Sequence, residues 1–283
     1  MLQTASSAKW NIAFEACKQC HQRVQAVGSA RFKHDGKKSC LEGLYQQGSA
    51  KIRFPKSYTE SVETVLINTA GGLTGGDRLD WNLSLGTGSK VVATTQACEK
   101  SYRSTSGAAK ITTSIVMADD TSLHWLPQET ILYEGSRLAR SFSVEMGGNA
   151  EFLGLECLVL GRDAMGEKIS NVAFHDRWRI RQNGKLVFAD DLRLDADIQS
   201  MAGLAGQKAL ASLVYVGNHD RETLAGLADK LRAAAGLSRS GFSVLENRIT
   251  GRILSENSYE LRQVLAPVLG VLRDTELPKV WRL

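Results

Sequence analysis

Hydrophobic and polar residues alternate along much of the first two hundred positions. In the clearest run Leu79, Trp81, Leu83 and Leu85 are separated by polar residues, the pattern of a strand with one buried face. The same period, or a run of β-forming residues, returns at 90–95, 111–117, 123–125, 142–146, 151–160, 178–181 and 185–189. Gly- and Asn-rich turns separate these runs, at intervals of about eight to twelve residues. This spacing predicts stacked sheets of many strands.

A helical period is found only near the C-terminus. Asn218 is placed to cap a first helix, which we expect to end at Gly236. Asn257 and Glu260 form a capping box for a second helix, and Pro267 should kink or break that helix. The predicted fold class is therefore mainly β, with many-stranded stacked β-sheets and two helices near the C-terminus.

The chain shows no internal repeat and no clear linker. We expect residues 1–37 to be a variable N-terminal lead-in and residues 38–283 to form a single β-rich domain. No apolar stretch reaches the roughly 20 residues that a transmembrane helix needs. The N-terminus has no apolar core of a signal peptide. These features predict a cytoplasmic protein without a membrane partner, in which the five cysteines are thiols.

The charge balance bears on the kind of partner. Lys and Arg number 35 against 30 Asp and Glu, which gives a net charge of +5 spread along the chain. So small an excess, with no basic stripe, argues against nucleic acid. In the segment 175–181, alternation places Asp176, Trp178 and Ile180 on one strand face and three arginines on the other. This pattern is typical of a half-buried strand whose basic face is free to meet a protein.

Cys17, Cys20 and His21 match the C-x-x-C-H pattern of c-type haem attachment. Because that chemistry normally follows export, a weak metal site is the more plausible functional interpretation, with Zn or Ni as the ion. Chance occurrence is more plausible still, since no second Cys/His pair stands at ligand spacing.

A glycine-rich segment at 71–78 resembles a phosphate loop only superficially. It lacks the Lys-Ser/Thr ending of that loop and leads into a strand, so no helix N-terminus is available to hold an anion. We expect a tight turn shaped by Gly71, Gly72, Gly75 and Gly76, followed by Asp77 and Arg78 at the entry to the strand.

Catalytic motifs are scarce. The sequence has no G-x-S-x-G elbow, and its five histidines are dispersed. Glu129, Glu134, Glu156 and Glu167 could supply paired carboxylates, although the sequence alone does not bring any two together. A β-rich enzyme with an unrecognised carboxylate site therefore remains an alternative to a binding protein.

Four segments resemble the UreD (also called UreH) family of urease accessory proteins. They are TAGGLTGGDRL at 69–79, TTQACEKSYRS at 94–104, WLPQETILYEGSR at 125–137 and GLECLVLGRDAMGE at 154–167. Residues 176–194 and the closing LPKVWRL also fit. The matches keep their order over roughly residues 41–283. The cysteine pair near the N-terminus lies outside them.

The resemblance implies a non-catalytic scaffold or chaperone for urease maturation. Such proteins dock the urease apoprotein, a helical accessory protein of UreF type and a nickel-delivering GTPase of UreG type. They allow nickel to enter a dinickel site bridged by a carbamylated lysine. No tightly bound cofactor is expected, although nickel would pass transiently.

Within that picture two groups of side chains are candidates for partner binding or nickel passage. The carboxylates are Asp77, Glu129, Glu156 and Glu167. The docking or orienting residues are Arg78, Lys100, Tyr102, Arg103, Arg137 and Arg162.

Overall fold

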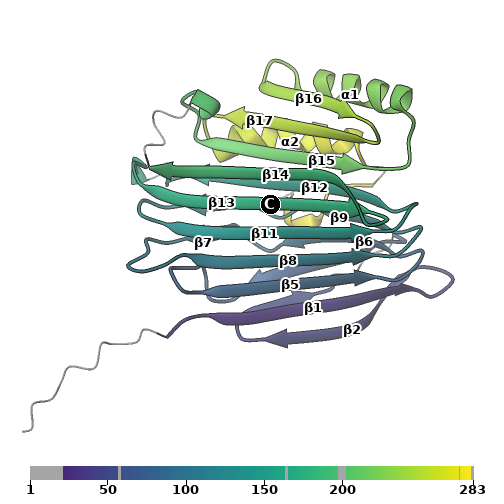
Figure 1. Cartoon of the computed structure of the whole chain (residues 1–283), viewed down its shortest axis with the longest axis horizontal. Coiled ribbons are helices and arrows are strands. Elements are labelled where there is room, and N and C mark those ends of the chain that lie inside the picture. The colour runs from purple at the N-terminus through teal and green to yellow at the C-terminus, as the bar shows by residue number, and fades with distance from the viewer. Residues whose placement is uncertain (1–21, 57–58, 163–164, 197–201, 274, 282–283) are drawn as a thin grey trace, which may run out of the picture.

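The computed structural model describes residues 22–56, 59–162, 165–196, 202–273 and 275–281. Two β-sheets lie face to face, and two helices pack against the second sheet (Figure 1). This arrangement confirms the predicted mainly β fold with two helices in the C-terminal part.

The first sheet has seven strands in the order β14-β13-β11-β8-β5-β1-β2. Their bounds are β1 (Gln25–His34), β2 (Ser39–Gln47), β5 (Arg78–Leu85), β8 (Ala109–Met117), β11 (Arg137–Met146), β13 (Val172–Gln182) and β14 (Lys185–Ala196).

The second sheet has ten strands, eight of them in the order β16-β17-β15-β12-β9-β6-β4-β3. These are β3 (Ala50–Arg53), β4 (Val62–Asn68), β6 (Lys90–Thr95), β9 (Ser122–Trp125), β12 (Glu151–Leu160), β15 (Ala209–Val216), β16 (Arg239–Leu245) and β17 (Arg248–Ser255). Two short strands, β7 (Glu99–Ser101) and β10 (Thr130–Leu132), pair beside β12. The helices are α1 (Arg221–Ala235) and α2 (Ser258–Val271), with short 3-10 turns at Ala202–Leu204 and Lys279–Trp281.

From β4 to β13 the chain winds as a coil that alternates between the sheets. Strands β5, β8, β11 and β13 are parallel neighbours in the first sheet, and β4, β6, β9 and β12 follow the same path in the second. Each turn of the coil therefore adds one strand to each sheet. Its corners stack at two ends: short turns at 86–89, 118–121 and 147–150, and longer corners at 69–77, 96–108, 126–136 and 161–171.

Two apolar cores separate the three layers. Along β12, alternation sends Phe152 and Leu158 into the core between the sheets, whereas Leu153 and Leu155 enter the core beneath the helices. This double burial explains why residues 152–160 of β12 form an almost continuous apolar run with one charged residue, Glu156.

Strand β1 lies within residues 1–37, for which the sequence analysis predicted a lead-in. It pairs with β2 on one side and β5 on the other, and Ala26, Ala30 and Phe32 are buried. Small residues dominate its inward positions, so hydrophobicity gave little sign of it. At Gly28 an added Cβ would lie 2.3 Å from the Trp81 ring, so the indole occupies the space of the missing side chain.

The C-terminal part departs from prediction in three details. Helix α1 is capped by Asp220, whose side chain accepts a hydrogen bond from Thr223 N at 2.8 Å; the prediction of Asn218 was wrong. Helix α2 is capped by Asn257 as predicted, and it continues through Pro267 instead of breaking there. Its buried leucines hold the helix on both sides of the proline, which removes only one internal hydrogen bond. Strands β15, β16 and β17 were not anticipated.

Candidate functional site

A small cavity lies between the two sheets. This interior cavity has a volume of about 60 Å³, room for a few water molecules. Its polar lining includes Glu99, Thr130, Arg140, Glu156 and Asp176. Charged groups at such depth require compensation, because desolvation penalises the ionised form.

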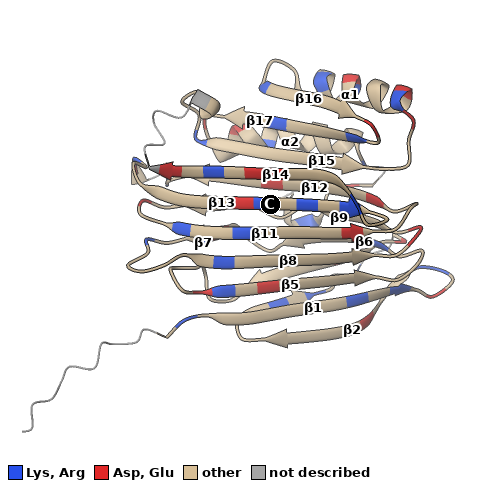
Figure 2. Cartoon of the chain, in the orientation of Figure 1, with Lys and Arg blue, Asp and Glu red and all other residues tan. Residues whose placement is uncertain are grey.

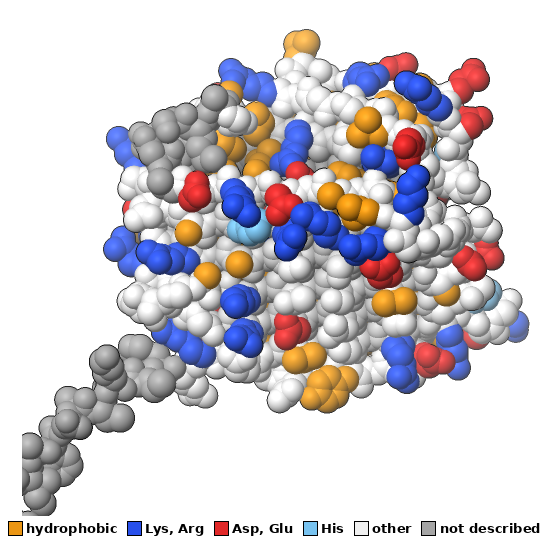
Figure 3. Space-filling model, in the orientation of Figure 1, with side chains coloured by type: hydrophobic (Ala, Val, Ile, Leu, Met, Phe, Trp, Pro, Cys, Tyr) orange, Lys and Arg blue, Asp and Glu red, His pale blue; other side chains and the backbone are white. Residues whose placement is uncertain are grey.

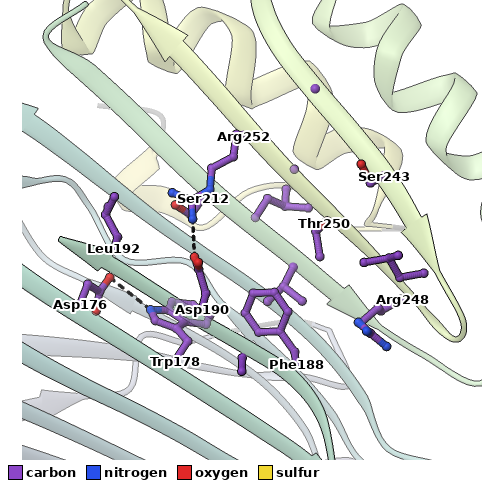
Figure 4. A pocket seen from close by; sticks show the side chains of 16 residues that line it. Asp176, Trp178, Phe188, Asp190, Leu192, Ser212, Ser243, Arg248, Thr250 and Arg252 are labelled. Carbon is purple, nitrogen blue, oxygen red and sulfur yellow. Dashed lines mark hydrogen bonds and ion pairs between the residues drawn. The ribbon is translucent and has the colours of Figure 1, made fainter. Parts of the chain in front are cut away.

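A larger groove opens beside this cavity, where the second sheet extends past the edge of the first. This edge groove has a volume of about 480 Å³ and runs between β13–β14 on one side and β15–β17 on the other (Figure 4). An ion pair between Asp190 and Arg252 crosses it. Asp176 lines both the edge groove and the interior cavity, so the two spaces adjoin at this carboxylate.

Arg140 holds the junction between the two spaces. Its Nη2 donates to Asp176 Oδ2 at 2.5 Å, and its Nη1 donates to Glu156 Oε2 at 2.6 Å and Thr130 Oγ1 at 3.0 Å. The side chains of Arg140, Glu156 and Asp176 are 9%, 11% and 7% exposed. Asp176 is the direct neighbour of Arg140 across β11 and β13, whereas Glu156 comes from β12 in the opposite sheet. The triad therefore bonds one sheet to the other.

Aromatic rings fix the two carboxylates. Trp125 Nε1 donates to Glu156 Oε1 at 3.1 Å, and Trp178 Nε1 donates to Asp176 Oδ2 at 3.2 Å. Phe142 stacks on Trp178 with 4.2 Å between centroids and contacts Trp125 at 5.2 Å. Each carboxylate is thus oriented by an indole as well as by the guanidinium.

The electrostatics of the cavity follow from burial and from the triad. Burial raises the pKa of Glu156, against the attraction of Arg140. Burial alone would lower the pKa of Arg140, but Asp176 and Glu156 outweigh it and raise that pKa. Burial also raises the pKa of Glu99 to about 7, although Asn68 donates to both of its oxygens at 3.2 Å.

Glu129, predicted as a passage carboxylate, does not line the cavity. It is 5% exposed and pairs with Arg262 of α2 at 2.9 Å. It also accepts from Cys98 Sγ at 3.3 Å, and burial raises the pKa of that thiol to about 12. Arg262 in turn lies over the Trp281 ring at 5.2 Å, so this cluster ties α2 and the C-terminal segment to the second sheet.

The four longer corners form one surface, which we call the corner surface (Figure 1, left, beside β7). Backbone hydrogen bonds link each corner to the next: Leu73 N to Lys100 O, Tyr133 N to Ser101 O, and Gly135 N to Asn171 O. The segments that resemble the accessory-protein family include these corners. They are far apart in sequence, and the coil stacks them at one end of the molecule.

Several predicted residues meet on the corner surface. Tyr102 is 41% exposed and packs edge-on against Tyr133, with 5.2 Å between centroids. Arg162 lies over the other ring of this pair, 4.6 Å from the Tyr133 centroid, and bonds Glu167 at 2.9 Å. Glu167 also accepts from the backbone of Glu134 and Arg162, which fits a role in holding the last corner together.

The other predicted residues fall into two groups. Asp77 is buried and accepts from Val24 N and Thr74 N, both at 2.8 Å, so it fixes the entry to β5. Positive φ at Gly71, Gly72 and Gly76 shapes the preceding turn as expected. The remaining cations are exposed on or beside the corner surface: Arg78, Lys100, Arg103 and Arg137.

Arg140 and Asp176 were not among the candidate residues. Both occupy inward positions in runs of apolar residues: Asp176 is in phase with Trp178 and Ile180, and Arg140 with Phe142 and Val144. A charged residue in the buried phase of a strand is the signal that could have identified them.

The described residues contain neither a cluster of metal ligands nor a helix suited to spanning a membrane. Within the described part of the chain, no three His, Cys, Asp or Glu side chains are grouped as a metal site would require. The candidates Cys17, Cys20 and His21 lie outside the described residues. No described helix is both long enough and apolar enough to cross a membrane.

Fold and site together define a coiled, two-sheet β protein whose charged interior adjoins a surface groove. Residues 25–282 match the family model described as "UreD urease accessory protein". Urease accessory proteins UreD from Rhizobium leguminosarum bv. viciae and Sinorhizobium medicae are each 41% identical to this chain; the aligned regions cover 93% of it and 96% and 97% of theirs. The one from Agrobacterium fabrum is 40% identical, over 93% of this chain and 92% of its own.

The chain therefore belongs to the UreD family of urease accessory proteins, non-catalytic scaffolds that take part in urease maturation. Because members of this family are non-catalytic, the alternative of a β-rich enzyme is set aside.

The raised pKa of Glu99 predicts a pH-dependent stability difference. Because the folded state binds this proton more tightly than the unfolded state, wild-type stability should fall as pH rises from about 4.5 to 7. Glu99→Gln removes this dependence. Its stability relative to wild type should therefore rise over that range, by up to about 3 kcal/mol at about 1.4 kcal/mol per pKa unit. Denaturant unfolding at several pH values measures the difference.

Glu60→Gln is the matched control for this experiment. A hydrogen bond from Lys90 lowers the pKa of Glu60, so its removal should cost stability above the ordinary pKa of a glutamate and not below it. If the difference in unfolding free energy between Glu99→Gln and wild type stays constant between about pH 4.5 and 7, the assigned environment of Glu99 is contradicted.

Proposed function

We propose that this protein docks the urease apoprotein together with the helical accessory protein and the nickel-delivering GTPase, and that nickel travels through its interior on the way to urease. The observation that carries the proposal is that one carboxylate, Asp176, lines both the edge groove and the interior cavity. Membership in the UreD family supports urease as the protein that is matured.

The chemistry along this route suits a travelling divalent cation. Oxygen groups succeed one another from the groove inward: Asp190 and Ser212 in the edge groove, Asp176 at the junction, then Glu156 and Thr130 in the cavity. Carboxylate and hydroxyl oxygens bind Ni²⁺ more weakly than imidazole or thiolate groups, so the ion is able to leave. Transfer requires such release.

The corner surface supports a docking role. Exposed cations and the exposed Tyr102 share this surface; Figure 2 marks Lys and Arg positions toward this end of the first sheet, and Figure 3 shows Lys and Arg side chains there. Aromatic residues and arginine are enriched at protein interfaces, and exposed cations favour an acidic partner surface. We propose Lys100, Tyr102, Arg103, Arg137 and Arg162 as docking residues.

If nickel travels along this route, substitutions in the route should lower the nickel content of urease without preventing assembly of the accessory complex. Glu156→Gln and Asp176→Asn keep the shape of each side chain but remove a charge from the route. Urease matured with either variant should contain much less nickel and show correspondingly less activity, while the accessory complex still co-purifies. Metal analysis of purified urease and pull-down of the complex are the two measurements.

Glu145→Gln is the control for these variants, since this carboxylate on β11 is 49% exposed and lies outside both spaces. Unchanged nickel content in urease matured with Glu156→Gln and with Asp176→Asn would refute the passage.

Charge reversal tests the docking surface. Lys100→Glu combined with Arg137→Glu should weaken binding to an acidic partner by roughly tenfold or more, most strongly at low salt. Co-purification with urease apoprotein and with the helical accessory protein is measured separately, at two salt concentrations. Lys185→Glu, at the opposite end of the coil, should bind both normally. Full binding by the double variant would exclude the corner surface as a docking site.

A further inference from the structure

Arg140 lines the interior cavity and bonds Asp176, the residue that the linings of the cavity and the edge groove share. Asp176 lines both spaces, Glu156 lines the cavity, and one guanidinium bonds both carboxylates. Among the described residues that line the cavity, Arg140 is the only one with a positive charge. Any cation that moved past Asp176 into the cavity would meet this group there.

Two carboxylates that face one cationic group also suit a metal ion. Glu156 comes from the second sheet and Asp176 from the first, and Thr130 adds a hydroxyl beside them. Oxygen ligands of this kind, completed by water, satisfy the octahedral preference of divalent ions. A dication and a guanidinium repel each other and require the same oxygens, so the two cannot occupy the position together.

The hydrogen bonding of Arg140 is incomplete, as it is for Arg248 and Arg273. The Nε atom of Arg140 is buried and has no hydrogen-bond partner among the described residues. Buried polar groups are normally satisfied, so the free Nε leaves the two terminal nitrogens as the only hydrogen-bonded anchors of this guanidinium among the described residues. The carboxylates hold the two terminal nitrogens, and the Phe174 ring, 5.1 Å from the guanidinium carbon, contributes only a weak cation–π contact.

We propose that Glu156 and Asp176 form a latent divalent-cation site, occupied at rest by the guanidinium of Arg140. While Arg140 bonds both carboxylates, the route between groove and cavity is closed to metal. The site becomes available when Arg140 turns away from them. This inference rests on the proposed passage and adds its control: the route opens by exchange of one cation for another.

Nickel binding to the full-length chain tests the latent site. Arg140→Met removes the competing charge but retains an unbranched side chain, and it should bind one additional Ni²⁺ at least tenfold more tightly than any such site in wild type. Adding Asp176→Asn to this variant should abolish the gain. Titration calorimetry measures affinity and stoichiometry. Any nickel bound by Cys17 and Cys20 contributes equally to wild type and to each variant, so it does not affect the difference between them.

Arg179→Met is the matched control, because Arg179 also pairs with a carboxylate, Asp191, but outside both spaces. It should leave nickel binding unchanged. If Arg140→Met fails to fold, Arg140→Lys decides the question. One ammonium group cannot reproduce the two-pronged contact, so this variant should show a smaller gain that Asp176→Asn again removes. A folded Arg140→Met or Arg140→Lys chain that binds nickel no more tightly than wild type overturns the proposal.

The latent site and the passage can fail separately. A gain of nickel binding in Arg140→Met, together with normal nickel loading of urease by Glu156→Gln and Asp176→Asn, would uphold the site and refute the passage. Loss of loading in those two variants, without any gain in Arg140→Met, would uphold the passage and refute the latent site.

Discussion

One buried guanidinium joins the two sheets of this protein and also lies across the space between them. A carboxylate left alone at this depth would carry a large desolvation cost, and breaking a buried ion pair typically costs about 3–5 kcal/mol. Arg140 therefore cannot be exchanged freely for an apolar residue while Glu156 and Asp176 remain. Three apolar residues of similar total volume would join the sheets as well or better. The persistence of three charges in the core points to a role other than stability.

The coil explains why the surface features lie together. Each turn contributes one strand to each sheet and one corner to each end, so segments about thirty residues apart become neighbours. The short turns at one end leave little room for functional side chains. At the other end the longer corners carry the exposed tyrosine and arginines of the corner surface. The interior and the corner surface are therefore products of one winding pattern.

Most strands of the coil were predictable from alternation or from runs of β-forming residues, and β6 and β12 were predicted to the residue, whereas β4 was not predicted. Strand β1 was missed because its inward residues are small, and β16 because its burial is only partial. Of the cavity residues, only Glu156 was singled out from sequence, as one of four glutamates that could supply paired carboxylates. Its partners come from other strands, and no local pattern encodes the register that places Asp176 beside Arg140. Glu129 looked equivalent in sequence, yet the fold pairs it with a helix.

The central claim is that nickel moves through the interior of this protein, and blocking that space without altering its charge tests the claim most directly. Thr113 is buried in the cavity lining, and Thr113→Leu would fill much of the available volume, while Thr112→Leu places the same change on the outer face of β8. The nickel content of urease matured with each variant is the decisive measurement. The account predicts low nickel content with Thr113→Leu despite an intact complex, and normal content with Thr112→Leu. Full nickel content with a folded, assembled Thr113→Leu protein would contradict it.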